Sequence, residues 1–203
     1  MLETVTFEDF GDDPVPLLCF TGGFATFRIE YAIKSFDLSV EMRRNPDHWR
    51  QWVRTPEGIE YTNEDGQKLV QHSNVERRAL PDGTRFSGKY LDYSETAAAG
   101  LAILNWTFFD FRSDGTFSTC SASQVAGASI GVSNDEEPRR DGHYEIADYG
   151  ITLSYSDNKV ESNPFFFSTQ ATKGLWMGAK TESGMRSRYF YVYDESKHRN
   201  CFD

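Results

Sequence analysis

The chain has 203 residues, of which 38% are hydrophobic, 15% aromatic and 26% charged, and its formal net charge is −10. This composition is that of a folded globular protein and excludes an intrinsically disordered one, which would carry far fewer aromatic residues. The acidic balance disfavours nucleic acid as a partner, because a negative surface repels the phosphate backbone. No segment approaches the roughly 20 apolar residues of a membrane helix, so no membrane association is expected.

The N-terminal segment and the cysteines indicate the compartment. The first thirteen residues, MLETVTFEDFGDD, contain neither the basic segment nor the apolar core of a secretory signal. The three cysteines, Cys19, Cys120 and Cys201, are widely spaced and match neither a disulfide framework nor a C-x-x-C site. We therefore expect reduced thiols in a cytoplasmic protein.

The N-terminal third of the chain predicts about five strands. Apolar and polar residues alternate over residues 25–33, ATFRIEYAI, as in a half-buried strand. The apolar phase then shifts by one residue over residues 36–42, so we expect a long strand with a bend near Lys34–Ser35. The alternative is a helix over residues 32–42. Pro46 favours the start of a further helical turn.

After a polar connector at residues 74–84, the sequence predicts about eight more strands. Asp-Gly pairs, which tolerate the left-handed backbone of tight hairpins, punctuate this region at residues 82–83, 114–115 and 141–142. We also expect a short helix within residues 94–104 and a long loop over residues 124–140. The predicted strands span residues 86–94, 101–112, 115–124, 142–148, 151–156, 159–168, 174–181 and 186–193.

One hairpin of this region, NWTFFDFRSDGTFSTCSAS at residues 105–123, concentrates aromatic residues. We predict two strands joined at Asp114–Gly115. Strand alternation places Trp106 and Phe108 on one face and Phe109 and Phe111 on the other. Only one of these pairs can line the interior of the barrel. The other pair must be covered by another part of the chain, for which the N-terminal strands are the candidate.

The second block of strands resembles the lipocalin-like (calycin) β-barrel group. The resemblance covers residues 86–193 and rests on SGKY (87–90) and MRSRYFYVY (185–193). Lipocalins tend to open their first strand with Gly-x-Trp and to carry a late arginine that packs over that ring. Gly88-Lys89-Tyr90, with tyrosine in place of tryptophan, and Arg186 or Arg188 would take these parts. The resemblance implies an eight-stranded barrel closed at one end by a cation–π contact.

The predicted fold is therefore all-β and antiparallel, with little helix. We expect a single domain over residues 1–203. Within it, residues 84–195 form a lipocalin-like barrel or strongly curled sheet, and the additional strands of residues 1–75 pack on it.

The motifs for metal, cofactor or nucleophilic chemistry are absent or lack their context. His48, His72, His143 and His198 share no ligand spacing, so no metal site is predicted, and no Gly-rich phosphate loop indicates a cofactor. GASIG at residues 127–131 matches G-x-S-x-G, but no strand-to-helix turn surrounds it, so Ser129 is interpreted as a loop serine.

A cavity inside the predicted barrel is the remaining candidate site. An eight-stranded barrel is just wide enough to hold one small ligand or to be filled by side chains. His143 and Glu145 share one face of a strand, and a histidine beside a carboxylate can act as a general base, so they are the candidate catalytic pair. The alternative is that His143, just after the Asp141–Gly142 turn, is a solvated residue at the end of the loop. The candidate ligand-binding residues are Trp106, Phe108, Asp110, Tyr144, Tyr155, Trp176, Arg188 and Tyr191.

Two functions remain after these exclusions. The first is binding of a small apolar or aromatic ligand in the barrel, with turnover as a cofactor-free isomerase or cyclase as its extension. The second is a non-enzymatic, acidic protein-binding module, such as an inhibitor or immunity protein, that docks a basic protein partner through residues 7–13 and 133–138. The sequence leaves open whether the protein is an enzyme.

Overall fold

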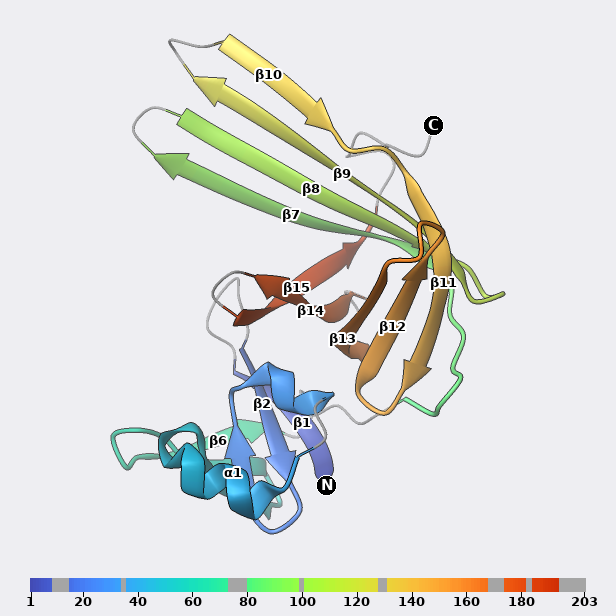
Figure 1. Cartoon of the computed structure of the whole chain (residues 1–203). Coiled ribbons are helices and arrows are strands. Elements are labelled where there is room, and N and C mark those ends of the chain that lie inside the picture. The colour runs from blue at the N-terminus through green and yellow to red at the C-terminus, as the bar shows by residue number, and fades with distance from the viewer. Residues whose placement is uncertain are drawn as a thin grey trace.

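The computed structural model describes residues 1–8, 15–33, 36–72, 80–98, 101–127, 131–167, 174–181 and 184–193. Two antiparallel, strongly curled β-sheets account for most of these residues, together with one α-helix and two short 3-10 helices (Figure 1). The predicted fold class, all-β and antiparallel with little helix, is confirmed. None of the helices in these ranges is long and apolar enough to cross a membrane.

The first sheet contains six strands, where the sequence analysis expected about five. Each strand pairs with the next one along the chain, and β6 returns to lie beside β1, so the sheet curls around its own core. Leu17, Cys19, Trp52, Ile59 and Tyr61 fill that core. The strands are β1 (Leu2–Glu8), β2 (Val15–Phe20), β3 (Phe24–Thr26), β4 (Arg50–Thr55), β5 (Gly58–Thr62) and β6 (Lys68–His72).

The long bent strand predicted over residues 25–42 is wrong, and the helical alternative holds for its second half. β3 ends at Thr26, and the chain continues into the 3-10 helix η1 (Ile29–Ala32) and the helix α1 (Leu38–Arg44). The Asp37 carboxylate caps α1 by accepting a hydrogen bond from the backbone N–H of Val40 (3.1 Å). The apolar phase shift thus reflects helical spacing. The bend expected at Lys34–Ser35 lies outside the described residues. The helical turn expected at Pro46 is confirmed as η2 (Pro46–His48).

The second sheet contains nine strands, eight of which pair in a closed circuit. Each strand of the circuit is antiparallel to its neighbours, and β15 pairs with β7 to close it. The ninth strand, β10, pairs with the end of β9 that projects beyond β11, so β7 to β10 extend side by side away from the rest (Figure 1). The strands are β7 (Gly88–Ala98), β8 (Leu101–Phe111), β9 (Thr116–Gly127), β10 (Gly131–Glu136), β11 (Arg140–Ala147), β12 (Gly150–Tyr155), β13 (Val160–Phe167), β14 (Leu175–Thr181) and β15 (Gly184–Val192).

Two expectations for this projecting part are wrong. The short helix predicted within residues 94–104 is wrong, because these residues include the end of β7 and the start of β8. The two strands form an antiparallel pair in which Gly88 lies opposite Phe111 and Ala98 lies opposite Leu101. The long loop predicted over residues 124–140 contains the end of β9, all of β10 and the first residue of β11. Alanine and glycine give little local preference for a strand, and cross-strand pairing decides their conformation.

The two faces of the second sheet bury different clusters. The inner face carries the main core, which includes Phe109, Phe111, Phe117, Tyr144 and Leu153. The outer face of β7, β8 and β9 carries a smaller cluster of Leu91, Phe108, Cys120 and Tyr193, with Trp106 packed against it. The division of the aromatic hairpin between two faces, and its turn at Asp114–Gly115, are confirmed.

A third cluster joins the two sheets. Tyr149 and Phe166 of the second sheet pack among residues of the first sheet and its helices, including Phe20, Tyr31 and Trp49. The hydroxyl of Tyr149 also donates a hydrogen bond to the backbone carbonyl of Glu3 (3.1 Å). The N-terminal strands and helices therefore cover part of the outside of the second sheet.

The Asp141–Gly142 pair is not the hairpin turn that the sequence analysis expected, because both residues lie inside β11. A β-carbon at Gly142 would meet the carbonyl oxygen of Ser154 and would lie 2.8 Å from the ring of Phe117. Gly142 faces the interior, so the absence of a side chain there leaves room for the rings of Phe117 and Tyr155, which lie 5.2 Å apart.

Gly142→Ala is therefore expected to lower the free energy of unfolding by about 1–3 kcal/mol through overpacking, as measured by urea denaturation. Gly66→Ala is the matched control, because a β-carbon there meets nothing within 4 Å and only the positive φ of +76° opposes it. A larger loss for Gly66→Ala than for Gly142→Ala would contradict this account of β11.

The cysteines differ from the expectation of reduced thiols. Cys19 is buried, and its Sγ–H donates a weak hydrogen bond to the carbonyl of Leu17 (3.9 Å), whereas Cys120 is disulfide-bonded; Cys201 lies outside the described residues. The expectation is therefore wrong for Cys120. Because stable disulfides are typical of oxidising compartments, the cysteines no longer support the cytoplasmic location, which stays a prediction.

Candidate functional site

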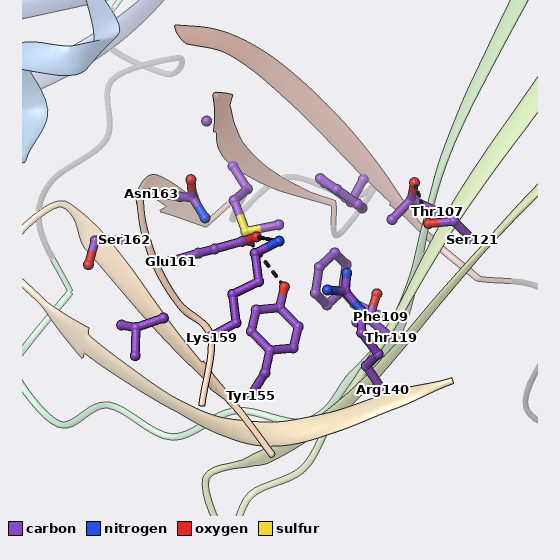
Figure 2. A pocket seen from close by; sticks show the side chains of 14 residues that line it. Thr107, Phe109, Thr119, Ser121, Arg140, Tyr155, Lys159, Glu161, Ser162 and Asn163 are labelled. Atoms are coloured by element: carbon purple, nitrogen blue, oxygen red, sulfur yellow. Dashed lines mark hydrogen bonds and ion pairs between the residues drawn. The ribbon is translucent and has the colours of Figure 1, made fainter. Parts of the chain in front are cut away.

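A cavity of about 560 Å³ lies on the inner face of the second sheet (Figure 2). Its volume is within the range of roughly 300–1,000 Å³ that is typical of small-molecule sites. Seven strands or their connecting turns contribute to its wall. The lining residues are Phe109, Met177, Gly178, Phe190 and Val160; Thr107, Thr119, Ser121, Ser162 and Asn163; and Arg140, Tyr155, Lys159 and Glu161.

Strand alternation and register bring these side chains together. On β8 and β9, Thr107 pairs with Ser121 and Phe109 pairs with Thr119, so two aligned pairs point to the same face. Arg140, the first residue of β11, pairs with Thr119 and continues that row. The cavity wall thus combines a ring, three hydroxyls and a guanidinium on three adjacent strands.

The opposite wall contains a hydrogen-bonded group of three side chains. Lys159 forms an ion pair with Glu161, with Nζ 2.6 Å from Oε1. The hydroxyl of Tyr155 donates a hydrogen bond to Oε2 of the same carboxylate (3.1 Å), as Figure 2 shows. Burial raises the pKa of Tyr155 well above its usual value, and the negative charge and hydrogen bond of Glu161 raise it further. The phenol therefore stays protonated at neutral pH and acts as a donor.

Arg140 lies against the same tyrosine. Its guanidinium carbon is 4.6 Å from the centroid of the Tyr155 ring, within the range of a cation–π interaction. Among the described side chains, no carboxylate forms an ion pair with Arg140 and no acceptor hydrogen-bonds to it. The charged groups in the described lining are Arg140, Lys159 and Glu161, so the cavity carries a net positive charge.

The structure brings only part of the predicted ligand-binding set to this cavity. Tyr155 lines it, and Tyr144 is buried in the adjacent core, where its hydroxyl donates to the carbonyl of Phe86 (2.8 Å). Trp106 and Phe108 lie on the outer face of the sheet. Asp110 also lies on that face and pairs with Arg112 (3.2 Å). The side chains of Trp176, Arg188 and Tyr191 lie outside the described residues.

The predicted catalytic pair does not line the cavity. His143 and Glu145 are exposed on β11, on the face opposite to the buried Tyr144 and Ile146. They are neighbours on the outside of the sheet, and neither is among the described residues that line the cavity. Their catalytic role stays a prediction without support from their position.

Sequence reasoning missed Arg140, Lys159 and Glu161, although the alternation of inward- and outward-facing residues along the strands indicates that they face the cavity. Arg140, Gly142, Tyr144 and Ile146 alternate on one face of β11, so two buried residues indicate that Arg140 faces inward. Lys159 and Glu161 follow the Asp157–Asn158 turn after Tyr155, which places them across a hairpin from that ring.

Comparisons with known proteins add no relative. No family model matches the chain, and neither a curated protein nor a solved structure matches it. The curled, barrel-like sheet is thus established by the strand pairings, whereas membership of the lipocalin-like group stays a prediction from the sequence.

Proposed function

We propose that the protein binds a small molecule in the cavity of its second sheet. The observation that carries this proposal is a cavity of about 560 Å³ whose lining combines apolar side chains with a few converging polar groups. Phe109, Met177 and Phe190 offer apolar contact, and each is at most 5% exposed. The hydroxyls of Thr107 and Ser121 and the amide of Asn163 offer hydrogen bonds that can orient a ligand.

A neutral, environment-sensitive dye, phenylnaphthylamine, tests the proposal directly. Its emission, excited above the tryptophan band, is expected to rise and saturate as it enters the cavity of the folded protein. Ser121→Trp places a large side chain in the cavity and is expected to weaken this binding by about tenfold or more. Binding is followed by titration, with circular dichroism to confirm that each variant folds.

Ala147→Trp is the matched control, because Ala147 is exposed at the end of β11 and faces away from the cavity. It adds the same ring without filling the site, so the affinity for the dye should stay unchanged. The proposal is rejected by a folded wild-type protein that binds neither this dye nor its sulfonated analogue, anilinonaphthalene sulfonate, or by a folded Ser121→Trp variant that binds the neutral dye as the wild type does.

Turnover as a cofactor-free isomerase or cyclase is an extension of this proposal. A general acid or base must reach the proton that it moves. Glu161 and Tyr155 line the cavity, whereas the exposed His143 does not, so proton transfer in the cavity would use the first two. The alternative of an acidic protein-binding module depends on residues 7–13 and 133–138, and most of their side chains lie outside the described residues.

A further inference from the structure

The balance of charge in the cavity distinguishes Arg140 from the other ionic residues. Lys159 and Glu161 neutralise each other in a short ion pair, and Glu161 also accepts the hydrogen bond of Tyr155. Arg140 has no such counter-charge among the described side chains and contacts the Tyr155 ring instead. A partly buried cation without an anionic partner is stabilised when a ligand supplies one.

The orientation of Arg140 suits recognition of an oxyanion that accepts two parallel hydrogen bonds. A guanidinium that lies against an aromatic face is restricted in its motion, while its N–H groups remain available at its edge. Carboxylates and sulfonates accept two such N–H donors in parallel, which is geometry that lysine does not offer. Arg140 lines the cavity together with Tyr155, Phe109 and Thr119, as Figure 2 shows.

The rest of the wall defines the other end of such a ligand. Phe109, Met177 and Phe190 are buried and apolar, so they favour a hydrocarbon or aromatic body. The hydroxyls of Thr107 and Ser121 lie 3.5 Å apart beside this apolar surface and tolerate a polar substituent. An inorganic anion would leave the apolar wall without a contact.

We infer that the ligand is a small amphipathic anion, whose apolar body packs on Phe109, Met177 and Phe190 and whose carboxylate- or sulfonate-like group binds Arg140. This inference rests on the proposed function, because it names the class of ligand for the same cavity. The protein as a whole has a net charge of −10 and therefore repels anions in general. The positive charge of Arg140 offsets this repulsion inside the cavity.

Two dyes with the same ring system separate the apolar contribution from the charge. Phenylnaphthylamine is neutral, and anilinonaphthalene sulfonate adds a sulfonate to the same rings. Wild-type protein is expected to bind the sulfonate about tenfold or more tightly than the neutral dye, which is the size of effect that a charge-assisted hydrogen bond produces. Arg140→Gln is expected to remove that preference while it leaves the affinity for the neutral dye within about twofold.

Two further variants make the result specific. Arg44→Gln removes the same charge from an exposed position of α1 that does not line the cavity, and should leave both affinities unchanged. Arg140→Lys keeps the charge without the planar donor pair, and should restore only part of the preference. Folding of each variant is checked by circular dichroism.

The outcomes distinguish this inference from the proposed function. If neither dye binds the folded wild type, the proposed function fails and the inference fails with it. If the neutral dye binds as tightly as the sulfonate, or if Arg140→Gln and Arg44→Gln weaken the sulfonate equally, the cavity binds ligands without an anion site and only the inference is overturned.

Discussion

Phe111→Ala is expected to lower the free energy of unfolding by about 3–5 kcal/mol, measured by urea denaturation at neutral pH. Phe111 is 1% exposed and is the centre of the inner aromatic cluster of the second sheet. Its ring centroid lies 4.8 Å from that of Phe86, 5.3 Å from that of Phe109 and 5.2 Å from that of Tyr144. Truncation removes these contacts at once and leaves a void that rings held by separate strands cannot fill.

Two variants of the same hairpin serve as controls. Phe111→Leu keeps most of the volume and is expected to cost less than about half as much as the alanine variant. Tyr93→Ala removes a ring of similar size from a position that is 42% exposed on the neighbouring strand, and should have a small effect. A loss for Tyr93→Ala as large as that for Phe111→Ala would mean that the inner cluster is not the core of this sheet.

The aromatic hairpin at residues 105–123 shows which structural features the sequence predicts and which it does not. Period-two alternation separates Phe108 from Phe109, and the structure places them in different clusters. Alternation does not say which face is concave, because that depends on the direction in which the whole sheet curls. Trp106 and Phe108 belong to the predicted ligand-binding set, whereas the cavity lies on the side of Phe109.

The segments that the sequence misassigned share a physical cause. The residues of β7 and β8 near the Ala97–Ala98 end have weak local preference, and long-range pairing with β8 and β9 decides their conformation. Residues 38–44 show the reverse case, where a local signal was present. Asp37 caps the helix, and the apolar positions Leu38 and Met42 are four residues apart, which is also an even spacing that a strand would show.

The candidate site was harder to predict than the strands, because it depends on registers between distant segments. Arg140 and Tyr155 meet only because β11 pairs with β12 so that Gly142 faces Tyr155. Their separation of fifteen positions matches no motif. The assignment of Asp141–Gly142 to a turn also moved the predicted start of β11 to residue 142, which left Arg140 outside the strand.

Phe166→Ala is expected to uncouple the two sheets, as well as to lower the free energy of unfolding by about 3–5 kcal/mol. Phe166 is 3% exposed and belongs to the cluster through which the second sheet contacts Phe20, Tyr31 and Trp49. The wild-type sheets are expected to unfold together, because each buries part of the other's apolar surface. Loss of this ring weakens the contact between the two sheets, so they should unfold at different denaturant concentrations.

Phe165→Ala provides a matched control one residue away. Phe165 is 4% exposed, but it faces the inner core of the second sheet, beside Phe86. Its removal should destabilise the protein by a similar amount and leave the contact between the two sheets intact. Hydrogen exchange measured separately for peptides from β2 and from β12, over a series of urea concentrations, distinguishes the two cases. Phe166→Ala should give different opening free energies for the two peptides, and Phe165→Ala should lower both together. The opposite pattern would show that the sheets are coupled through some contact other than the Phe166 cluster.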